Sequence, residues 1–343
     1  MQKAIDLHYF LCSVIISKFK GRLCVGEMEK RSLFGFNKYK ILLCLLFASL
    51  QTIAGNKNGS HHLNSTQLSE REVTVKFVYK IVVDGHLNSM RLKMVLPDDI
   101  KDRQTIESIE YSTEPDSTYK INSNNYVLFK FYDIEKSFKI TIKCKLVIYN
   151  NIKSKNDSTN FNLSRYLEPE RFIESESPQI IALAATLKQK TDIETVMKTF
   201  EYVKENIHYE LKEAIGAEQV LSSHVGKCMD FSDLFVALLR ANKIPAKSEF
   251  GMDVDSYDSN PLHAWPEAYL KKQGWVRFDP TTGHSSIEHD GKNYIMKIDN
   301  KYITLSEGRN EPELRMRQYQ YSYFCTRGST VSVKASYDIA ALE

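Results

Sequence analysis

Three residues of this chain have the types and the order that catalysis by a thiol requires. Cys228 stands directly ahead of a predicted helix, His263 lies near the start of a predicted strand, and Asp279 lies near the end of the next. A thiolate is a nucleophile, an imidazole can carry its proton, and a carboxylate can fix the tautomer of that imidazole. Alone, each has a more ordinary interpretation, as a buried thiol, a polar strand residue and a turn former.

The helix predicted after Cys228 would favour the reactive form of its thiol. Apolar residues recur there at helical spacing: Phe231, Leu234, Phe235, Leu238 and Leu239. Unpaired N–H groups and the positive end of the dipole at a helix start favour a thiolate over a thiol. Gly226 lets the backbone turn tightly just before the cysteine.

His263 and Asp279 lie on two short predicted strands joined as a hairpin. The segments 262–270 and 274–281 are connected through Lys271-Lys-Gln-Gly274. A hairpin brings the start of one strand beside the end of the next, so we expect both side chains at the same end. The pairing of residues between the two strands is not predicted, because it depends on the loop length and on the effect of Pro266.

The motifs around these residues resemble the core of the transglutaminase-like superfamily. They read GKCMDF at 226–231, HAWPE at 263–267 and GWVRFDPT at 274–281, and the resemblance covers about residues 165–285. It implies a papain-like α+β fold. It also implies that Cys228 is the nucleophile, His263 the base and Asp279 the acid that orients it.

The sequence departs from the animal transglutaminases in two respects. Those enzymes stabilise the oxyanion with a tryptophan upstream of the cysteine, whereas Trp265 and Trp275 both lie downstream here. The N–H of Cys228 could donate instead; the hydroxyl of Tyr209 is a second candidate, although we interpret Tyr209 as a core residue.

The animal enzymes also use calcium, and no calcium site is predicted here. Asp253, Asp255 and Asp258 lack the spacing of a calcium loop and are interpreted as a solvated loop. The histidines have no metal-ligand spacing with cysteines or acids. We therefore expect neither a metal nor a cofactor.

The function that this resemblance implies is acyl transfer by an exported thiol enzyme. Cys228 would attack an amide carbonyl of a protein or peptide and form a thioester. Water would resolve it in a peptidase or amidase and an amine in a transglutaminase; the missing upstream tryptophan favours hydrolysis. The alternative is a non-catalytic binding or scaffold module that retains the fold.

Residues 71–150 are predicted to form an all-β sandwich that precedes the catalytic region. Apolar and polar residues alternate along 73–81 and 140–148, and 126–132 forms a further strand. We expect this domain to present substrate or to act as a spacer.

After residue 162 the apolar period becomes helical. Helices are predicted from Pro178 and from the capping box at Thr191–Glu194. Strands are predicted near 246–251, 263–270 and 275–279, and in the tail at 294–305 and 315–333. We assign residues 165–343 to one catalytic domain with C-terminal strands.

Residues 1–54 have the layout of a leader with a signal peptide. A basic stretch precedes the apolar run ILLCLLFASL at 41–50, and small residues follow at Thr52 and Ala54. The competing interpretation is a buried apolar helix. Met28 stands where such a signal would begin, so residues 1–27 are interpreted as an over-long start. The protein is then exported: secreted, periplasmic or on the cell surface.

Composition and charge indicate a folded globular protein and argue against some kinds of partner. The chain has 343 residues, of which 42% are hydrophobic and 26% charged, as in folded globular proteins. The formal charge is +3, and the basic excess lies in the leader, which argues against a nucleic-acid partner. The apolar run is too short for a stable membrane span. The mature chain keeps Cys144, Cys228 and Cys325, which fits one free thiol and an optional Cys144–Cys325 bridge.

Overall fold

A computed structural model describes residues 70–149, 162–256, 260–282, 284–285 and 300–341. These residues all belong to one compact unit, residues 64–343. The predicted leader lies outside the described residues, as do Asp258 and the first part of the tail strand predicted at 294–305.

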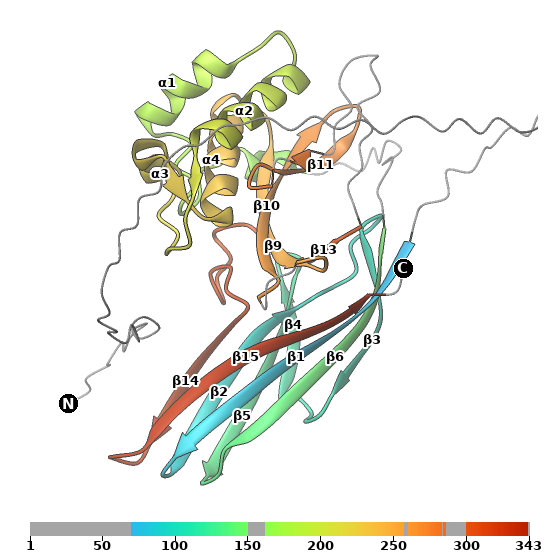
Figure 1. Cartoon of the computed structure of the whole chain (residues 1–343), viewed down its shortest axis with the longest axis vertical. Helices are drawn as coiled ribbons and strands as arrows, with labels where there is room; N and C mark the ends of the chain where they lie inside the picture. The colour runs from blue at the N-terminus through green and yellow to red at the C-terminus, as the bar shows by residue number, and fades with distance from the viewer. Residues whose placement is uncertain (1–69, 150–161, 257–259, 283, 286–299, 342–343) are drawn as a thin grey trace, which may run out of the picture. The chain divides into compact units, whose positions relative to one another are not determined.

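Two four-stranded antiparallel sheets form the β sandwich (Figure 1). Their strand orders are β15-β1-β6-β3 and β14-β2-β5-β4. Six of these strands come from the N-terminal part: β1 Glu70–Asp84, β2 Leu87–Leu96, β3 Gln104–Tyr111, β4 Ser117–Ile121, β5 Asn124–Ile134 and β6 Phe138–Tyr149. The period-two pattern along β1 turns every second side chain into the core, and Val75, Phe77 and Tyr79 are all fully buried.

The end of the chain completes both sheets. β14, Tyr319–Cys325, pairs with β2, and β15, Thr330–Ala341, pairs with β1 from Val73 to Asp84. This differs from the assignment of 165–343 to one catalytic domain, because the strands at its end lie in the sandwich. Alternation predicts a strand but not its partner, since pairing depends on which apolar faces the whole fold leaves uncovered.

The helical region follows the sandwich in the sequence. It contains a short 3₁₀ helix at Leu163–Tyr166, α1 Pro178–Leu187, α2 Asp192–Asn206, β7 His208–Tyr209, α3 Ala217–Ser223, β8 Val225–Gly226 and α4 Cys228–Ala241. α2 begins with the predicted capping box: the Thr191 side chain accepts from the Glu194 amide, and the Glu194 side chain accepts from the Thr191 amide. α3 was not predicted.

A five-stranded antiparallel sheet carries two of the candidate site residues. Its order is β12-β11-β10-β9-β13, with bounds β9 Ala246–Asp253, β10 Leu262–Leu270, β11 Gly274–Asp279, β12 His284–Ser285 and β13 Tyr302–Glu307. α4 packs against β9 and β10, and the helices gather beside this sheet in Figure 1. The predicted α+β architecture, with antiparallel sheets before the helices, is confirmed.

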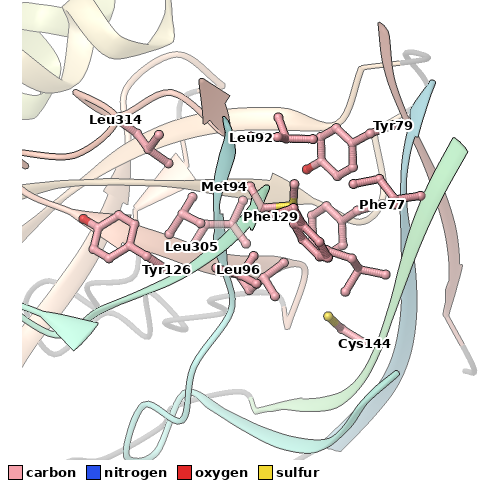
Figure 2. Close-up of a cluster of buried hydrophobic side chains, with 14 of the residues drawn as sticks. Phe77, Tyr79, Leu92, Met94, Leu96, Tyr126, Phe129, Cys144, Leu305 and Leu314 are labelled. Atoms are coloured by element: carbon pink, nitrogen blue, oxygen red, sulfur yellow. The ribbon is translucent and has the colours of Figure 1, made fainter. Parts of the chain in front are cut away.

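The apolar core of the sandwich continues into the five-stranded sheet. Leu305 of β13 lies in one buried cluster with Met94, Leu96 and Tyr126 of the sandwich (Figure 2). A second cluster joins the helices to the sheet, where Phe235 of α4 packs on Phe278 of β11 with ring centroids 5.1 Å apart. The sheet therefore contributes side chains to the buried cores of both the sandwich and the helices. No helix among the described residues is long and apolar enough to span a bilayer.

Candidate active site

Cys228 is the first residue of α4, and a buried carboxylate holds the loops before it. The Asp230 side chain is fully buried. Its Oδ1 accepts from the amides of Ile215 and Gly216 at 2.8 and 3.3 Å, and its Oδ2 accepts from the Lys227 amide at 3.0 Å. The aspartate of the GKCMDF motif thus fixes the backbone that presents the cysteine.

Gly226 is required by the close approach of that aspartate. A Cβ at this position would lie 2.6 Å from the Cβ of Asp230, nearer than real atoms approach. β8 pairs here with β7 in parallel, with Gly226 opposite Tyr209. Tyr209 is 55% exposed, so its interpretation as a core residue is wrong. Its ring reaches the edge of the helical core at Phe231, with centroids 6.4 Å apart, because β7 runs along the surface.

His263 and Asp279 meet at the end of the hairpin that the sequence predicts. Nε2 of His263 lies 2.9 Å from Oδ2 of Asp279, and the two side chains are 14% and 2% exposed. The Cys228 side chain is within hydrogen-bonding reach of the same ring. Because Asp279 occupies Nε2, Nδ1 is the nitrogen that remains for the thiol. Cys228 is only half-buried, so the three side chains share a site that solvent can reach.

The contacts of His263 make it a cation at neutral pH. Burial by itself would lower its pKa, but the hydrogen bonds to Asp279 and Cys228 and the charges of these groups raise the pKa of His263 to about 10. For Asp279, burial would raise the pKa, but the bond to His263 and the donors around the carboxylate lower it to about 2. The pair is therefore an imidazolium beside a carboxylate over a wide range of pH.

Tyr302 is a further residue of the site, which the sequence analysis missed. Its hydroxyl donates to Oδ2 of Asp279 at 2.6 Å. Its ring stacks on His263 at 5.9 Å and on Trp265 at 4.6 Å between centroids. The backbone amides of Thr281 and Thr282 donate to the other carboxylate oxygen at 3.1 and 3.2 Å. No motif marks Tyr302, because it lies within an alternating apolar segment remote from HAWPE.

Trp265 lies in the interior of the site. It is fully buried, and its Nε1 donates to Oε2 of Glu249 at 3.1 Å. Gly251 of β9, which pairs with His263, allows this packing, since a Cβ there would lie 2.8 Å from the Trp265 ring and 1.9 Å from the Ile303 carbonyl oxygen. Trp275 instead packs edge-on against Tyr166, at 4.7 Å between centroids.

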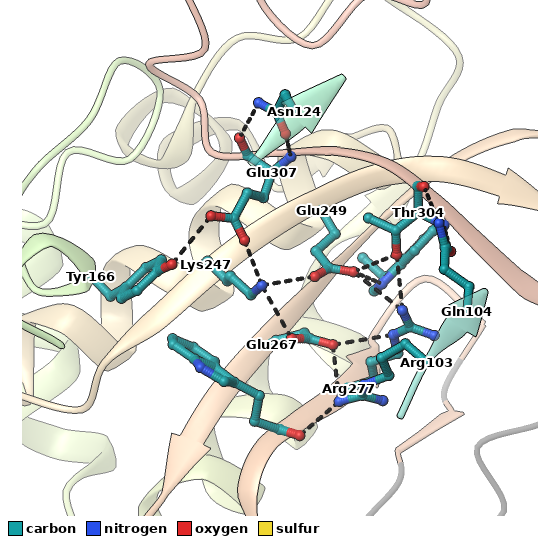
Figure 3. A network of polar contacts seen from close by, with 12 residues as sticks. Arg103, Gln104, Asn124, Tyr166, Lys247, Glu249, Glu267, Arg277, Thr304 and Glu307 are labelled. Atoms are coloured by element: carbon teal, nitrogen blue, oxygen red, sulfur yellow. Dashed lines mark hydrogen bonds and ion pairs between the residues drawn. The ribbon is translucent and has the colours of Figure 1, made fainter. Parts of the chain in front are cut away.

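Glu249, which accepts from Trp265, belongs to a buried network of charges. Figure 3 shows this network. Glu267 of the HAWPE motif accepts from Arg277 at 3.1 Å, and Arg103 of the sandwich lies 3.1 Å from the same oxygen. Glu249 is 2.9 Å from Lys247 and 3.4 Å from Arg277. Burial would raise the pKa of Glu249, but Lys247 and Arg277 lower it to about 2, so it remains ionised.

The other cysteines and acidic residues lie apart from this site. Cys144 and Cys325 are both free thiols, so the optional bridge between them is not formed. Burial raises the pKa of Cys144 to about 12. Asp253 pairs with Lys301 at 2.9 Å and Asp255 with Arg71 at 2.6 Å. Within the described part of the chain, no group of three His, Cys, Asp or Glu side chains could hold a metal ion.

The structure thus brings Cys228, His263 and Asp279 together, and their catalytic role stays a prediction. The arrangement can do what a thiol nucleophile needs: a sulfur beside a protonated ring, and a carboxylate that holds this ring.

Comparison with known proteins agrees with the fold. Residues 181–280 match the family model described as the transglutaminase-like superfamily. The uncharacterized protein YebA of Bacillus subtilis (strain 168) is 32% identical over 101 residues; this match spans 25% of the chain and only 14% of YebA. A candidate cysteine protease from Cytophaga hutchinsonii has a similar structure, with a TM-score of 0.57 and 16% identity over 80% of this chain and 92% of that one.

Proposed function

We propose that this protein is a cysteine-dependent enzyme that cleaves or exchanges amide bonds in proteins or peptides. The observation that carries the proposal is the contact of His263 with both Cys228 and Asp279 in a solvent-accessible site. A scaffold that only retained the fold would have no need of all three groups.

In the first step the Cys228 sulfur attacks the amide carbonyl as a thiolate. The electrons of the carbonyl move to its oxygen, for which the N–H of Cys228 in the first turn of α4 is a suitable donor. His263 gives its proton to the departing nitrogen, the C–N bond breaks, and an amine leaves. A thioester on Cys228 remains, with a neutral imidazole beside it.

In the second step a nucleophile resolves the thioester. His263 takes a proton from a water molecule or an amine, which attacks the thioester carbonyl and expels the Cys228 thiolate. Water yields a carboxylic acid, and an amine yields a new amide. We propose hydrolysis as the main outcome, because the tryptophan that stabilises the oxyanion upstream of the cysteine in animal transglutaminases has no counterpart in this sequence.

The reactivity of Cys228 provides the direct test. We expect iodoacetamide to label Cys228 at about pH 6, where an ordinary thiol is almost wholly protonated. Cys144 should stay unlabelled because it is fully buried, and Cys325, which is half-buried, should not be labelled under these conditions. The variant His263→Ala should slow labelling of Cys228. If Cys228 reacts no faster than a free thiol, the scaffold alternative is the better one.

The reaction type is tested with a protein substrate such as casein and a labelled primary amine. Release of peptides without incorporation of the amine supports a peptidase, and incorporation supports a transglutaminase. Cys228→Ala is the control and should abolish both. The absence of both products over a broad set of substrates would contradict the proposal that this protein is an enzyme.

We further propose that the enzyme acts outside the cytoplasm, on the strength of the basic and apolar stretches before Ala54. N-terminal sequencing of the native protein should find its start just after Ala54. Native protein that still carries residues 28–54 would contradict export by this signal.

A further inference from the structure

We infer that Tyr302 is a positioning residue for the His263–Asp279 pair and that the β sandwich holds it there through Gln104 and Asn124. The importance of this positioning for catalysis rests on the function proposed above. The sandwich is then part of the active site's framework, which replaces our expectation of a substrate-presenting or spacing module.

Tyr302 has the contacts that a positioning residue needs. Its hydroxyl donates to Oδ2 of Asp279, the same oxygen that faces Nε2 of His263, and its ring stacks on His263 with an interplanar angle of 20°. It therefore limits movement of both the carboxylate and the imidazole. Its contacts are with the carboxylate and the imidazole, so its action on the chemistry is indirect.

The strand that carries Tyr302 is at the edge of its sheet. β13 pairs with β9 on one side only, and the register shifts between Thr304 and Ser306. Such an edge leaves backbone N–H and C=O groups without a partner strand. Those groups are buried here, because Thr304 and Ser306 are 4% and 3% exposed.

Two side-chain amides of the sandwich take the place of the missing strand (Figure 3). Gln104 accepts from the Thr304 amide at 2.8 Å and donates to the Thr304 carbonyl at 3.0 Å. Asn124 accepts from the Glu307 amide at 2.9 Å and donates to the Glu307 carbonyl at 3.2 Å. Each amide thus satisfies both backbone groups of one residue, as a neighbouring strand would.

The geometry of these two contacts fixes the position of β13. Gln104 and Asn124 are 0% and 2% exposed, so water cannot replace them readily. Thr304 is two residues from Tyr302, and its side chain also donates to Glu249 at 2.9 Å. A loss of the Gln104 contact would leave buried backbone groups unsatisfied and free the strand to shift, and the Tyr302 hydroxyl would move with it.

Two variants test the inference in the full chain. Tyr302→Phe removes only the hydroxyl, and Gln104→Leu removes the amide at similar size. We expect either change to let the carboxylate drift from the ring, so that the midpoint of the His263 titration falls by about one unit and labelling of Cys228 at about pH 6 slows about tenfold. The titration is followed by NMR of labelled histidine, and the labelling by mass spectrometry with iodoacetamide.

The matched control is Tyr79→Phe, which removes a buried hydroxyl bonded to Gln318 at 2.6 Å within the sandwich. This variant should change neither the midpoint of the His263 titration nor the rate at which Cys228 is labelled. If Gln104→Leu does not fold, Gln104→Glu keeps an acceptor for the Thr304 amide and puts a carboxylate oxygen against its carbonyl in place of the donor.

The outcomes separate this inference from the proposed function. A folded Tyr302→Phe protein whose His263 midpoint is unchanged or raised overturns the positioning role. Wild-type Cys228 that labels no faster than a free thiol overturns the proposed function, while the His263 titration still decides the role of Tyr302.

Discussion

His263 and Asp279 link the stability of the fold to pH. Unfolded, they would titrate near about 6.5 and 3.9. In the folded protein the pKa of His263 is about 10, so its contribution is fully present below about pH 6.5 and is lost as the pH rises through about 10. The pKa of Asp279 is lowered to about 2, so its contribution is present above about pH 3.9 and is lost as the pH falls through about 2.

The variant Asp279→Asn tests this linkage. It keeps the size of the side chain but removes the charge, so the pKa of His263 should fall toward its ordinary value. The loss in free energy of unfolding should be largest between about pH 4 and 6.5 and should shrink as the pH approaches about 10. Urea unfolding at a series of pH values measures it. Asp338→Asn, at an exposed position on β15, is the control; a loss independent of pH for Asp279→Asn would contradict the linkage.

At the scale of secondary structure, a row of three lysines crosses the outer face of the sandwich. Lys80 of β1 lies opposite Lys139 of β6 and Lys334 of β15, and all three are exposed. Like charges directly opposite on neighbouring strands destabilise a sheet. These strands therefore derive their stability from the buried face of the sheet. The row of lysines lowers that stability.

Replacing the central lysine should stabilise the protein. Lys80→Glu converts two repulsions into two attractions, and we expect the free energy of unfolding to rise by about 0.5–1 kcal/mol, less at high salt. Urea unfolding at low and high salt measures the change. Lys76→Glu is the matched control, because Lys76 already lies opposite Lys143 and Asp338 and should change stability little. An equal gain for both variants would contradict the pairwise explanation.

At the scale of the whole molecule, the sandwich and the part that holds the helices and the five-stranded sheet depend on each other. Arg103 of the sandwich is buried against Glu267 of β10 and donates to the Trp275 carbonyl at 2.7 Å. The chain leaves the sandwich after β6 and returns to it with β14 and β15. Neither region therefore has a complete set of partners without the other.

We expect the described unit to unfold in one cooperative step. The buried contacts between the regions would have to break together, so scanning calorimetry should show one transition whose calorimetric and van't Hoff enthalpies agree. Two separate transitions, or a calorimetric enthalpy well above the van't Hoff value, would show that the regions unfold independently.

The local parts of this protein could be predicted from its amino-acid sequence. The alternation along β1 and β6, the capping box at Thr191 and the helix after Cys228 follow from interactions between residues close in the chain. The spacing within the hairpin likewise placed His263 and Asp279 at one end, and the motifs indicated which residues could do chemistry together.

The contacts between distant segments became known from the complete fold. Gln104 and Thr304 are 200 positions apart, and no local pattern predicts that a side-chain amide would satisfy the edge of β13. The same holds for Tyr302 on Asp279, for the exposure of Tyr209 and for the pairing of β15 with β1. These contacts arise because buried polar groups and apolar faces must find partners wherever the complete fold brings them, and local periodicity carries no record of that choice.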